Sequence, residues 1–358
     1  MKIRDSRVLW LGAIGVVGGT LLFACSAQEG PQDIEGDGVW PAEEWATSSA
    51  AAEGIDQGAI DALVADIENG DYGLVDHFLL IRHGRVVADH HFSHDYAAIA
   101  AQYDTTNHQY NYDHPAWHPC YRDTDLHSLQ SVTKSITSAA LGIAIDEGLI
   151  EGVHVPVLPY FEDYEHDTSD SRKQAITLQD LLTMRSGIEW HTSGGYGSGV
   201  HSTDLLEASD HWIQFVLDQP MDEDPGAVFE YNDGVSVLIG KILWEATGQR
   251  ADRWVAERLF DRIGITDFYW KITPDGEADT EGGLYLSAHD LARIGYVFLR
   301  GGEWDGQQLI SEEWVRASTA PVVPDVAPEN DGTDVGYGYQ WWVPDQDAGR
   351  PLVFAGYG

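Results

Sequence analysis

The chain has 358 residues, of which 43% are hydrophobic and 22% are charged, so it is long enough and apolar enough to bury a sizeable core. This composition argues against an intrinsically disordered protein. Aspartate and glutamate total 59 against 20 lysines and arginines, and the formal net charge is −39. Such a charge repels phosphate backbones, so we expect no nucleic-acid partner and interpret the acidic surface as a solubility feature.

The N-terminal segment has the form of an export signal. Basic residues precede an apolar run over 8–24 that is short for a membrane-spanning helix, which needs about 20 apolar residues. The run ends in Leu-Phe-Ala-Cys at 22–25, which resembles a bacterial lipobox, where the chain is cut before an acylated cysteine. We therefore predict a signal peptide over 1–24 and a protein held by lipid on Cys25 at the periplasmic side, at the outer membrane because Ser26 follows. An uncleaved membrane anchor is the alternative.

Periodicity and turn residues predict strands near both ends of the exported chain and helices between them. Residues 25–55 are rich in Gly, Ala, Glu and Pro and are predicted to form a tether before a domain over 56–358. Long irregular loops are expected over 93–126 and 187–203. This order predicts an α+β fold without a second independent domain. The other expected elements are a helix over 60–67, a hairpin of 77–82 and 86–92, helices over 131–150 and 235–246, helices opened by capping boxes at 177–180 and 287–290, and strands over 337–343 and 352–354.

Ser131 and Lys134 form an S-x-x-K motif at the start of the expected helix over 131–150. A separation of three residues puts both side chains on one helix face, one turn apart. A serine hydroxyl is a weak nucleophile that needs an adjacent base, and a lysine serves when burial and nearby positive charge lower its pKa. The backbone N–H of a serine that opens a helix also points toward a developing oxyanion. By itself the motif is equally typical of an exposed helix start.

Five segments, in order along the chain, carry a family signature. His-Ser-Leu-Gln-Ser-Val-Thr-Lys-Ser at 127–135 resembles the nucleophile segment of the class C β-lactamase-like serine hydrolases, which include carboxylesterases and 6-aminohexanoate-dimer hydrolases. The further matching segments are 181–187, 229–233, 282–291 and 336–342. The resemblance implies a β-lactamase/transpeptidase-like α+β fold. In such a fold an antiparallel sheet is built from N- and C-terminal segments, flanked by helices, beside a mainly helical subdomain.

The resemblance also implies a role for Tyr231, as a second base beside Lys134 that passes the serine proton to the leaving group. Without the resemblance, Tyr231 would be interpreted as a core aromatic residue. Asp233 stands where the family usually has asparagine, which replaces an amide by a group that only accepts hydrogen bonds. A carboxylate there raises the pKa of Lys134. Asn232 is the alternative candidate for the amide role.

The C-terminal end departs from the family pattern. Residues 353–358 fall where the family has a triad centred on Lys or His, and this chain has neither residue there. The difference favours the esterase and 6-aminohexanoate-dimer hydrolase branch over β-lactamases proper. The resemblance implies substrate contacts for Gly356 and Asp233, and an oxyanion hole formed by the N–H groups of Ser131 and Tyr357. The family continues further, which points to a C-terminally incomplete domain with an open sheet edge.

Histidines number 15, and His114, His118 and Cys120 form an H-x3-H-x-C pattern. No H-E-x-x-H signature accompanies it, so we expect no metal site and no cofactor, and a structural role for Cys120. The resulting hypothesis is an exported serine hydrolase that cleaves a small-molecule ester or amide through an acyl-enzyme on Ser131. The alternative is a catalytically impaired relative that acts as an envelope or binding protein, which Asp233 and the short C-terminus favour.

Overall fold

The computed structural model describes residues 20–25, 39–41, 44–102, 124–167, 169–326, 335–344 and 352–357. The strands are β1 (Thr20–Cys25), β2 (Ala46–Thr47), β3 (His77–Arg82), β4 (Arg85–His91), β5 (His127–Ser128), β6 (Tyr269–Trp270), β7 (Leu284–Leu286), β8 (Glu303–Trp304), β9 (Gln307–Gln308), β10 (Val335–Tyr337), β11 (Trp342–Pro344) and β12 (Leu352–Tyr357). The helices are α1 (Gln57–Glu68), α2 (Tyr96–Ala100), α3 (Val132–Asp146), α4 (Ser171–Ala175), α5 (Leu178–Leu182), α6 (Ser202–Glu207), α7 (Trp212–Asp218), α8 (Asp233–Thr247), α9 (Ala251–Val255), α10 (Asp261–Ile263), α11 (Ala288–Leu299) and α12 (Glu312–Ser318).

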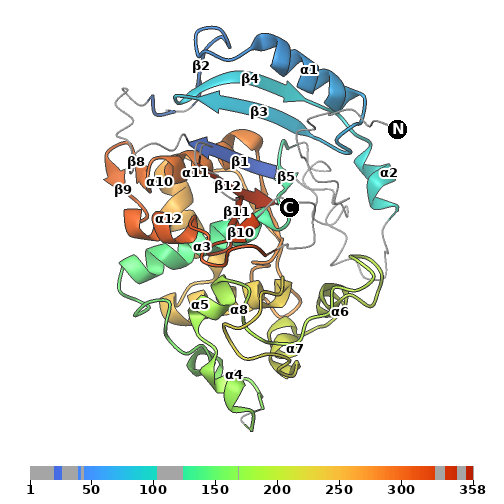
Figure 1. Ribbon diagram of the computed structural model, residues 1–358, viewed down its shortest axis with the longest axis vertical. Coiled ribbons are helices and arrows are strands. Elements are labelled where there is room, and N and C mark those ends of the chain that lie inside the picture. The colour runs from blue at the N-terminus through green and yellow to red at the C-terminus, as the bar shows by residue number, and fades with distance from the viewer. Residues whose placement is uncertain are drawn as a thin grey trace, which may run out of the picture.

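Strands gather in one half of the molecule and α4 to α8 in the other, with α3 between them (Figure 1). The largest sheet has the order β1-β12-β11-β10 and is antiparallel, so segments from both chain ends build it. This confirms the predicted fold class. β1 contains residues of the predicted signal peptide. A cleavage before Cys25 would remove these residues, so it is incompatible with the pairing of β1 and β12. The export therefore stays a prediction.

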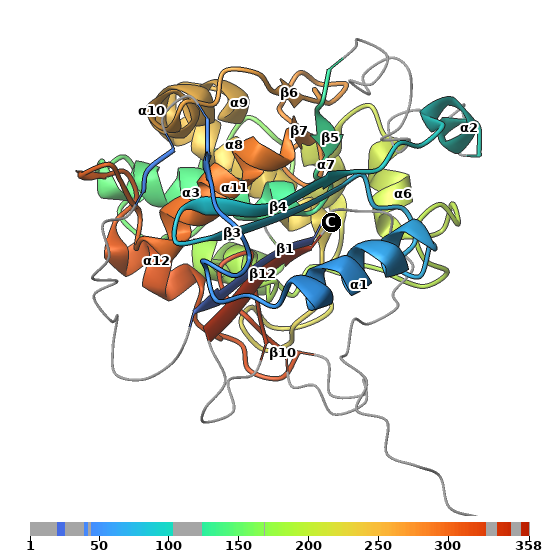
Figure 2. The same ribbon diagram turned by 90° about the horizontal axis from the view of Figure 1, so that it is seen from above.

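The predicted hairpin forms with the expected turn. β3 and β4 pair antiparallel, and His83 and Gly84 both have positive φ between them. β2 adds to β4 in parallel and comes from the predicted tether, of which Trp45 and Ala50 are buried. Helix α1 lies on this three-stranded sheet, seen from above in Figure 2, and Ile60 packs against Ala50. The fold thus encloses a small satellite core under α1.

Helix α3 is the centre of the main core. Almost all of its residues are buried, because its alanines, isoleucines and Gly142 suit a crowded helix surface. A Cβ at Gly142 would lie 2.5 Å from the Trp314 ring, so only glycine fits there. The helix ends at Asp146, four residues before the expected end, because Gly148 turns the chain with a φ of 74°.

The helix expected over 235–246 forms as α8, and its ends follow local signals. The side chain of Asn232 accepts from the N–H of Val235, and Gly248 ends the helix in a left-handed conformation with a φ of 71°. The strand expected over 337–343 is broken into β10 and β11, because Gln340 takes a φ of 64° and turns inward. Among the described residues, no helix combines the length and apolarity that a membrane crossing requires.

Candidate active site

Ser131 and Lys134 meet at the N-terminal end of α3. Ser131 directly precedes the helix, after Gln130 turns the chain with a φ of 41°. One helical turn later, Nζ of Lys134 donates to Oγ of Ser131 at 2.9 Å. The Lys134 side chain is only 1% exposed. The S-x-x-K motif is therefore a pair of touching side chains with a buried lysine and a partly buried serine, and not an exposed helix start.

Tyr231 joins this pair from the segment before α8. Its phenol lies near enough to Ser131 for that residue to lower the pKa of the phenol, and Nζ of Lys134 lies 5.3 Å from the centre of its ring. The ring stacks on Trp342 of β11, with centroids 5.7 Å apart and planes 21° apart. Burial raises the pKa of Tyr231, so the phenol carries its proton at neutral pH. The three residues that the sequence singles out thus converge on one hydroxyl.

Asp233 faces Lys134 from the first turn of α8. Its Oδ1 lies 2.7 Å from Nζ of Lys134, and both side chains are buried. Its Oδ2 accepts from the hydroxyls of Tyr196 at 3.0 Å and Thr203 at 2.6 Å. Both oxygens are therefore held by protein groups, and the expected substrate contact of Asp233 stays a prediction. Asn232, the alternative, caps α8 instead.

This ion pair fixes the protonation of the site. Burial lowers the pKa of Lys134, but Asp233, Tyr231 and Glu281 outweigh it and raise that pKa above its ordinary value. The same ammonium outweighs burial at Asp233 and holds the pKa of its carboxyl low. Lys134 is therefore an ammonium in the resting site, whereas a base requires the free amine.

Glu281, which sequence analysis did not select, completes the surroundings of Lys134. Nζ of Lys134 donates to the Glu281 backbone carbonyl at 2.6 Å and lies 3.5 Å from its Oε2. Burial, together with the charge of Asp233, raises the pKa of Glu281 to about 7. Its only sequence signal is its place directly before the segment 282–291. Among Lys134, Tyr231, Asp233 and Glu281, it is Glu281 whose pKa lies near neutral pH.

A second buried lysine continues the charge cluster behind Glu281. Nζ of Lys271 lies 2.9 Å from Oδ2 of Asp279 and 3.3 Å from Oε2 of Glu207. Burial, followed by the charges of neighbouring carboxyls, raises the pKa of Glu207 well above its ordinary value. The lysines and carboxyls therefore neutralise one another inside the protein, partly through retained protons.

Strand β12 lies against the first turn of α3. A Cβ on Gly356 would lie 3.3 Å from Cγ1 of Val132 and 3.4 Å from Oγ of Ser135, so the strand backbone approaches the helix closely. Tyr357 is 38% exposed, and its ring centre lies 6.0 Å from that of Trp342. The oxyanion role of Tyr357 and the substrate contact of Gly356 stay predictions.

The two long loops differ in what the structure describes. The loop over 187–203 supplies the Tyr196 and Thr203 hydroxyls that hold Asp233. Most of the loop over 93–126 lies outside the described residues, and with it the predicted H-x3-H-x-C pattern and Cys120.

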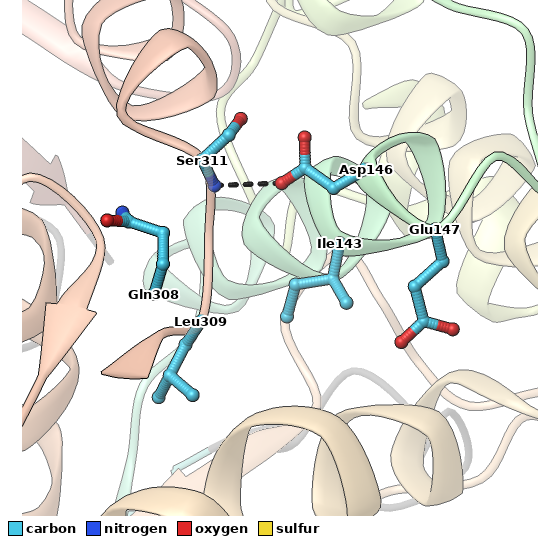
Figure 3. Close-up of a pocket in the computed structure, with 6 residues that line it drawn as sticks. All are labelled: Ile143, Asp146, Glu147, Gln308, Leu309 and Ser311. Carbon is cyan, nitrogen blue, oxygen red and sulfur yellow. Dashed lines mark hydrogen bonds between the residues drawn. The ribbon is translucent and has the colours of Figure 1, made fainter. Parts of the chain in front are cut away.

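A separate shallow pocket of about 320 Å³ lies at the other end of α3 (Figure 3). Ser311 is in it, but its N–H donates to Asp146 at 2.8 Å and no lysine or histidine lines the pocket. Its nearest lining residue on α3, Ile143, comes twelve residues after Ser131, a distance of roughly 18 Å along the helix. It takes no part in the Ser131 site.

Known proteins resemble this chain in sequence and in fold. The family model described as Beta-lactamase matches residues 67–358. The chain is 24% identical over 249 residues to the 6-aminohexanoate-dimer hydrolase of Paenarthrobacter ureafaciens, which covers 63% of this chain and 60% of that protein. It is 26% identical over 200 residues to the lovastatin esterase of Penicillium rubens, which covers 50% and 47%.

Among solved structures, EstCE1, described as a hydrolase with promiscuous acyltransferase activity, aligns with a TM-score of 0.61. The alignment covers 85% of this chain and 94% of that chain at 12% identity, which is a likeness of fold alone. The matched part of the chain spans 60% of the length of the 6-aminohexanoate-dimer hydrolase and 47% of the length of the lovastatin esterase.

Proposed function

Because the chain belongs to the beta-lactamase family, we propose that it is a serine hydrolase that cleaves a small-molecule ester or amide through an acyl-enzyme on Ser131. One observation carries the proposal: Nζ of Lys134 donates to the Ser131 hydroxyl at 2.9 Å, and Tyr231, whose ring centre lies 5.3 Å from that Nζ, stands beside the same hydroxyl. A nucleophile within hydrogen-bond reach of two proton-transfer groups is the arrangement that covalent catalysis requires. Relatives named as a lovastatin esterase and as a 6-aminohexanoate-dimer hydrolase support this reaction class.

The proton path of the proposed reaction begins with Lys134. Its ammonium must lose a proton before the amine accepts one from Ser131, and Glu281 is the nearby carboxyl with a pKa of about 7. Ser131 then attacks the carbonyl carbon, and its proton passes through Lys134 and Tyr231 to the leaving group. Water attacks the resulting acyl-enzyme along the same path in reverse. The N–H groups of Ser131 and Tyr357 are the proposed oxyanion donors.

A catalytically impaired binding protein is the second candidate, and one observation favours it. The Lys134–Asp233 contact of 2.7 Å stabilises the ammonium, which is the form that does not accept a proton. The retention of Ser131, Lys134 and Tyr231 in mutual contact favours the enzyme.

The experiment that separates the two candidates is labelling of the full chain with a fluorophosphonate, together with turnover of p-nitrophenyl butyrate. We expect stoichiometric labelling and ester turnover, both lost in Ser131→Ala. Ser138→Ala is the matched control, because Ser138 lies on the same helix, is buried, and does not belong to the site. An unlabelled native chain without turnover would favour the binding protein, and activity retained in Ser131→Ala would refute the nucleophile.

The substrate class is proposed from the side chains near Ser131. The rings of Tyr231, Trp342 and Tyr357 suit an apolar acyl or leaving group. The absence of Lys and His from 353–358 leaves no cation there for a substrate carboxylate. We therefore expect turnover of neutral esters and amides to exceed that of β-lactams and D-alanyl dipeptides, which parallel assays compare directly.

We propose in addition that the chain is exported and lipid-anchored through Cys25. The apolar run over 8–24 and the Leu-Phe-Ala-Cys at 22–25 support this proposal. Expression of the native chain with radiolabelled palmitate in a bacterium is expected to label the membrane fraction. Cys25→Ser is expected to lose the label, and equal labelling of both chains would exclude the anchor.

A further inference from the structure

A second cluster of titratable side chains lies outside the Ser131 site, where the hairpin meets β5 and α11. Histidines from four elements converge there. The ring centre of His77 lies 3.8 Å from that of His91, 5.5 Å from that of His289 and 6.3 Å from that of His127. We call this set, with three aspartates, the histidine cluster; its members are His77, His91, His127, His289, Asp76, Asp89 and Asp125.

His77 is the buried centre of the cluster, with only 3% of its side chain exposed. Its Nε2 is hydrogen-bonded to Oδ1 of Asp89 at 2.7 Å. Its Nδ1 is buried and has no hydrogen-bond partner among the described residues. An unsatisfied buried polar atom is costly, so this nitrogen needs an explanation.

His127 repeats the same arrangement. Its Nδ1 is hydrogen-bonded to Oδ2 of Asp76 at 3.2 Å. Its Nε2 is buried without a hydrogen-bond partner among the described residues and lies 3.4 Å from Oδ1 of Asp125. A histidine held by a carboxylate through one nitrogen, with the other left free, is the usual form of a metal ligand.

The cluster contains a set of three groups that can hold a single ion. One ring nitrogen of His77, one of His127 and a carboxylate oxygen of Asp125 all lie within 4.8 Å of one another. Zinc takes histidine nitrogen and carboxylate oxygen at about 2.0–2.2 Å in a tetrahedron, so two ligands stand about 3.4 Å apart. Nε2 of His127 and Oδ1 of Asp125 already lie 3.4 Å apart. We propose that His77, His127 and Asp125 bind one Zn²⁺-like divalent cation, with Asp89 and Asp76 orienting the two imidazoles.

The cluster holds a second such combination, His77, Asp89 and His289. The two oxygens of Asp89 are already taken, since Nε2 of His77 lies 2.7 Å from Oδ1 and Nε2 of His289 lies 3.1 Å from Oδ2. The Asp125 set is favoured because Nδ1 of His77 has no partner among the described residues, and the carboxylate that Nε2 of His127 faces is the third proposed ligand, Asp125.

The proposed ion ties together segments that are distant in the chain. His77 begins β3, whereas His127 begins β5 and stands four residues before Ser131. Asp125 is 57% exposed, which leaves room for water as a fourth ligand. The ion therefore fastens the hairpin to the strand that leads to the Ser131 turn, and its effect is on stability.

Zinc uptake by the full chain tests this proposal. The protein is stripped with a chelator, dialysed and titrated with Zn²⁺ by calorimetry, and bound metal is counted by mass spectrometry after gel filtration. We expect one Zn²⁺ per chain and a higher melting temperature in its presence. Asp125→Asn should weaken the zinc Kd at least tenfold, and Asp76→Asn about tenfold. His154→Ala is the matched control, because His154 is exposed and lies outside the cluster.

Two results would overturn the proposal. One is the lack of saturable uptake of Zn²⁺ by the native chain. The other is an unchanged Kd in Asp125→Asn, which would assign any bound zinc to other residues. Asp125 is exposed, so this variant is expected to fold, and circular dichroism verifies it.

Discussion

The charge cluster around Lys134 and the histidine cluster solve the same problem in different ways. Both gather several carboxyls at one place, which is unfavourable without positive charge. The Lys134 cluster is fully buried and contains two lysines, Lys134 and Lys271, that are ammonium ions in the resting protein. The histidine cluster is partly exposed and, among the described residues, has only histidines to balance its aspartates. The carboxyls of the Lys134 cluster are neutralised by its own lysines. Those of the histidine cluster need a protonated histidine or, as we propose, a metal ion.

The largest effect is expected from removing the cation of the buried cluster. Lys134→Met leaves the Asp233 carboxylate buried without its partner, which costs about 3–5 kcal/mol of unfolding free energy. It also removes the proton carrier of Ser131, so kcat should fall at least 10³-fold. Lys271→Met is the matched control, with a similar loss of stability in urea but with fluorophosphonate labelling retained. Equal loss of labelling in both variants would contradict the assignment of Lys134.

Glu281→Gln tests the proposed proton acceptor. The carboxyl is protonated below its pKa of about 7 and ionised above it, so native kcat should rise with pH through about 7. The glutamine variant should lose this rise and about 10²-fold in kcat. Because the folded-state pKa is raised, this group contributes stability below about 4.5 that is lost as pH rises through about 7.

The stability readout separates a proton role from a packing role of Glu281. As the pH rises from 5 to 8, the melting temperature of Glu281→Gln should increase relative to that of the native chain. A pH profile of kcat that is identical in the two proteins would remove Glu281 from the proton path.

Asp233→Asn is expected to give a smaller effect, in the opposite direction for activity. Removing the carboxylate lowers the pKa of Lys134, so the amine becomes available at lower pH. A shift of one unit corresponds to about tenfold, and we expect kcat/KM at pH 7 to rise by about that factor. Stability should fall by about 1–3 kcal/mol, measured by urea unfolding. A fall in kcat/KM with no change in its pH profile would mean that Asp233 does not limit Lys134.

The smallest effect is expected in the histidine cluster without metal. Asp125→Asn changes an exposed carboxylate, so the unfolding free energy of the metal-free chain should change by less than about 0.5 kcal/mol. Urea unfolding in the presence of a chelator measures it. A loss comparable with that of Lys134→Met would show that the two clusters do not differ as described.

Local signals in the sequence predicted the elements that local interactions determine. The hairpin of β3 and β4, the capping box at Thr177 and the end of α8 at Gly248 formed as expected. The Ser131–Lys134 contact was predictable because three residues on a helix are one turn apart.

Contacts between distant segments could not be predicted in this way. Lys134 and Glu281 are 147 residues apart, and Asp76 and His127 are 51 apart, with no spacing that links them. The break between β10 and β11 depends on Gln340, whose side chain accepts from Ser236 inside the core. The family resemblance supplied Tyr231, for which the residue pattern alone favoured a core aromatic.

Mass spectrometry of the chain quenched during turnover of p-nitrophenyl butyrate tests most directly whether Ser131 forms an acyl-enzyme. We expect a butyryl adduct on the peptide that contains Ser131, formed at the same rate as a burst of p-nitrophenol, and no adduct in Ser131→Ala. Turnover without an adduct on Ser131, or an adduct carried by another residue, would contradict this expectation.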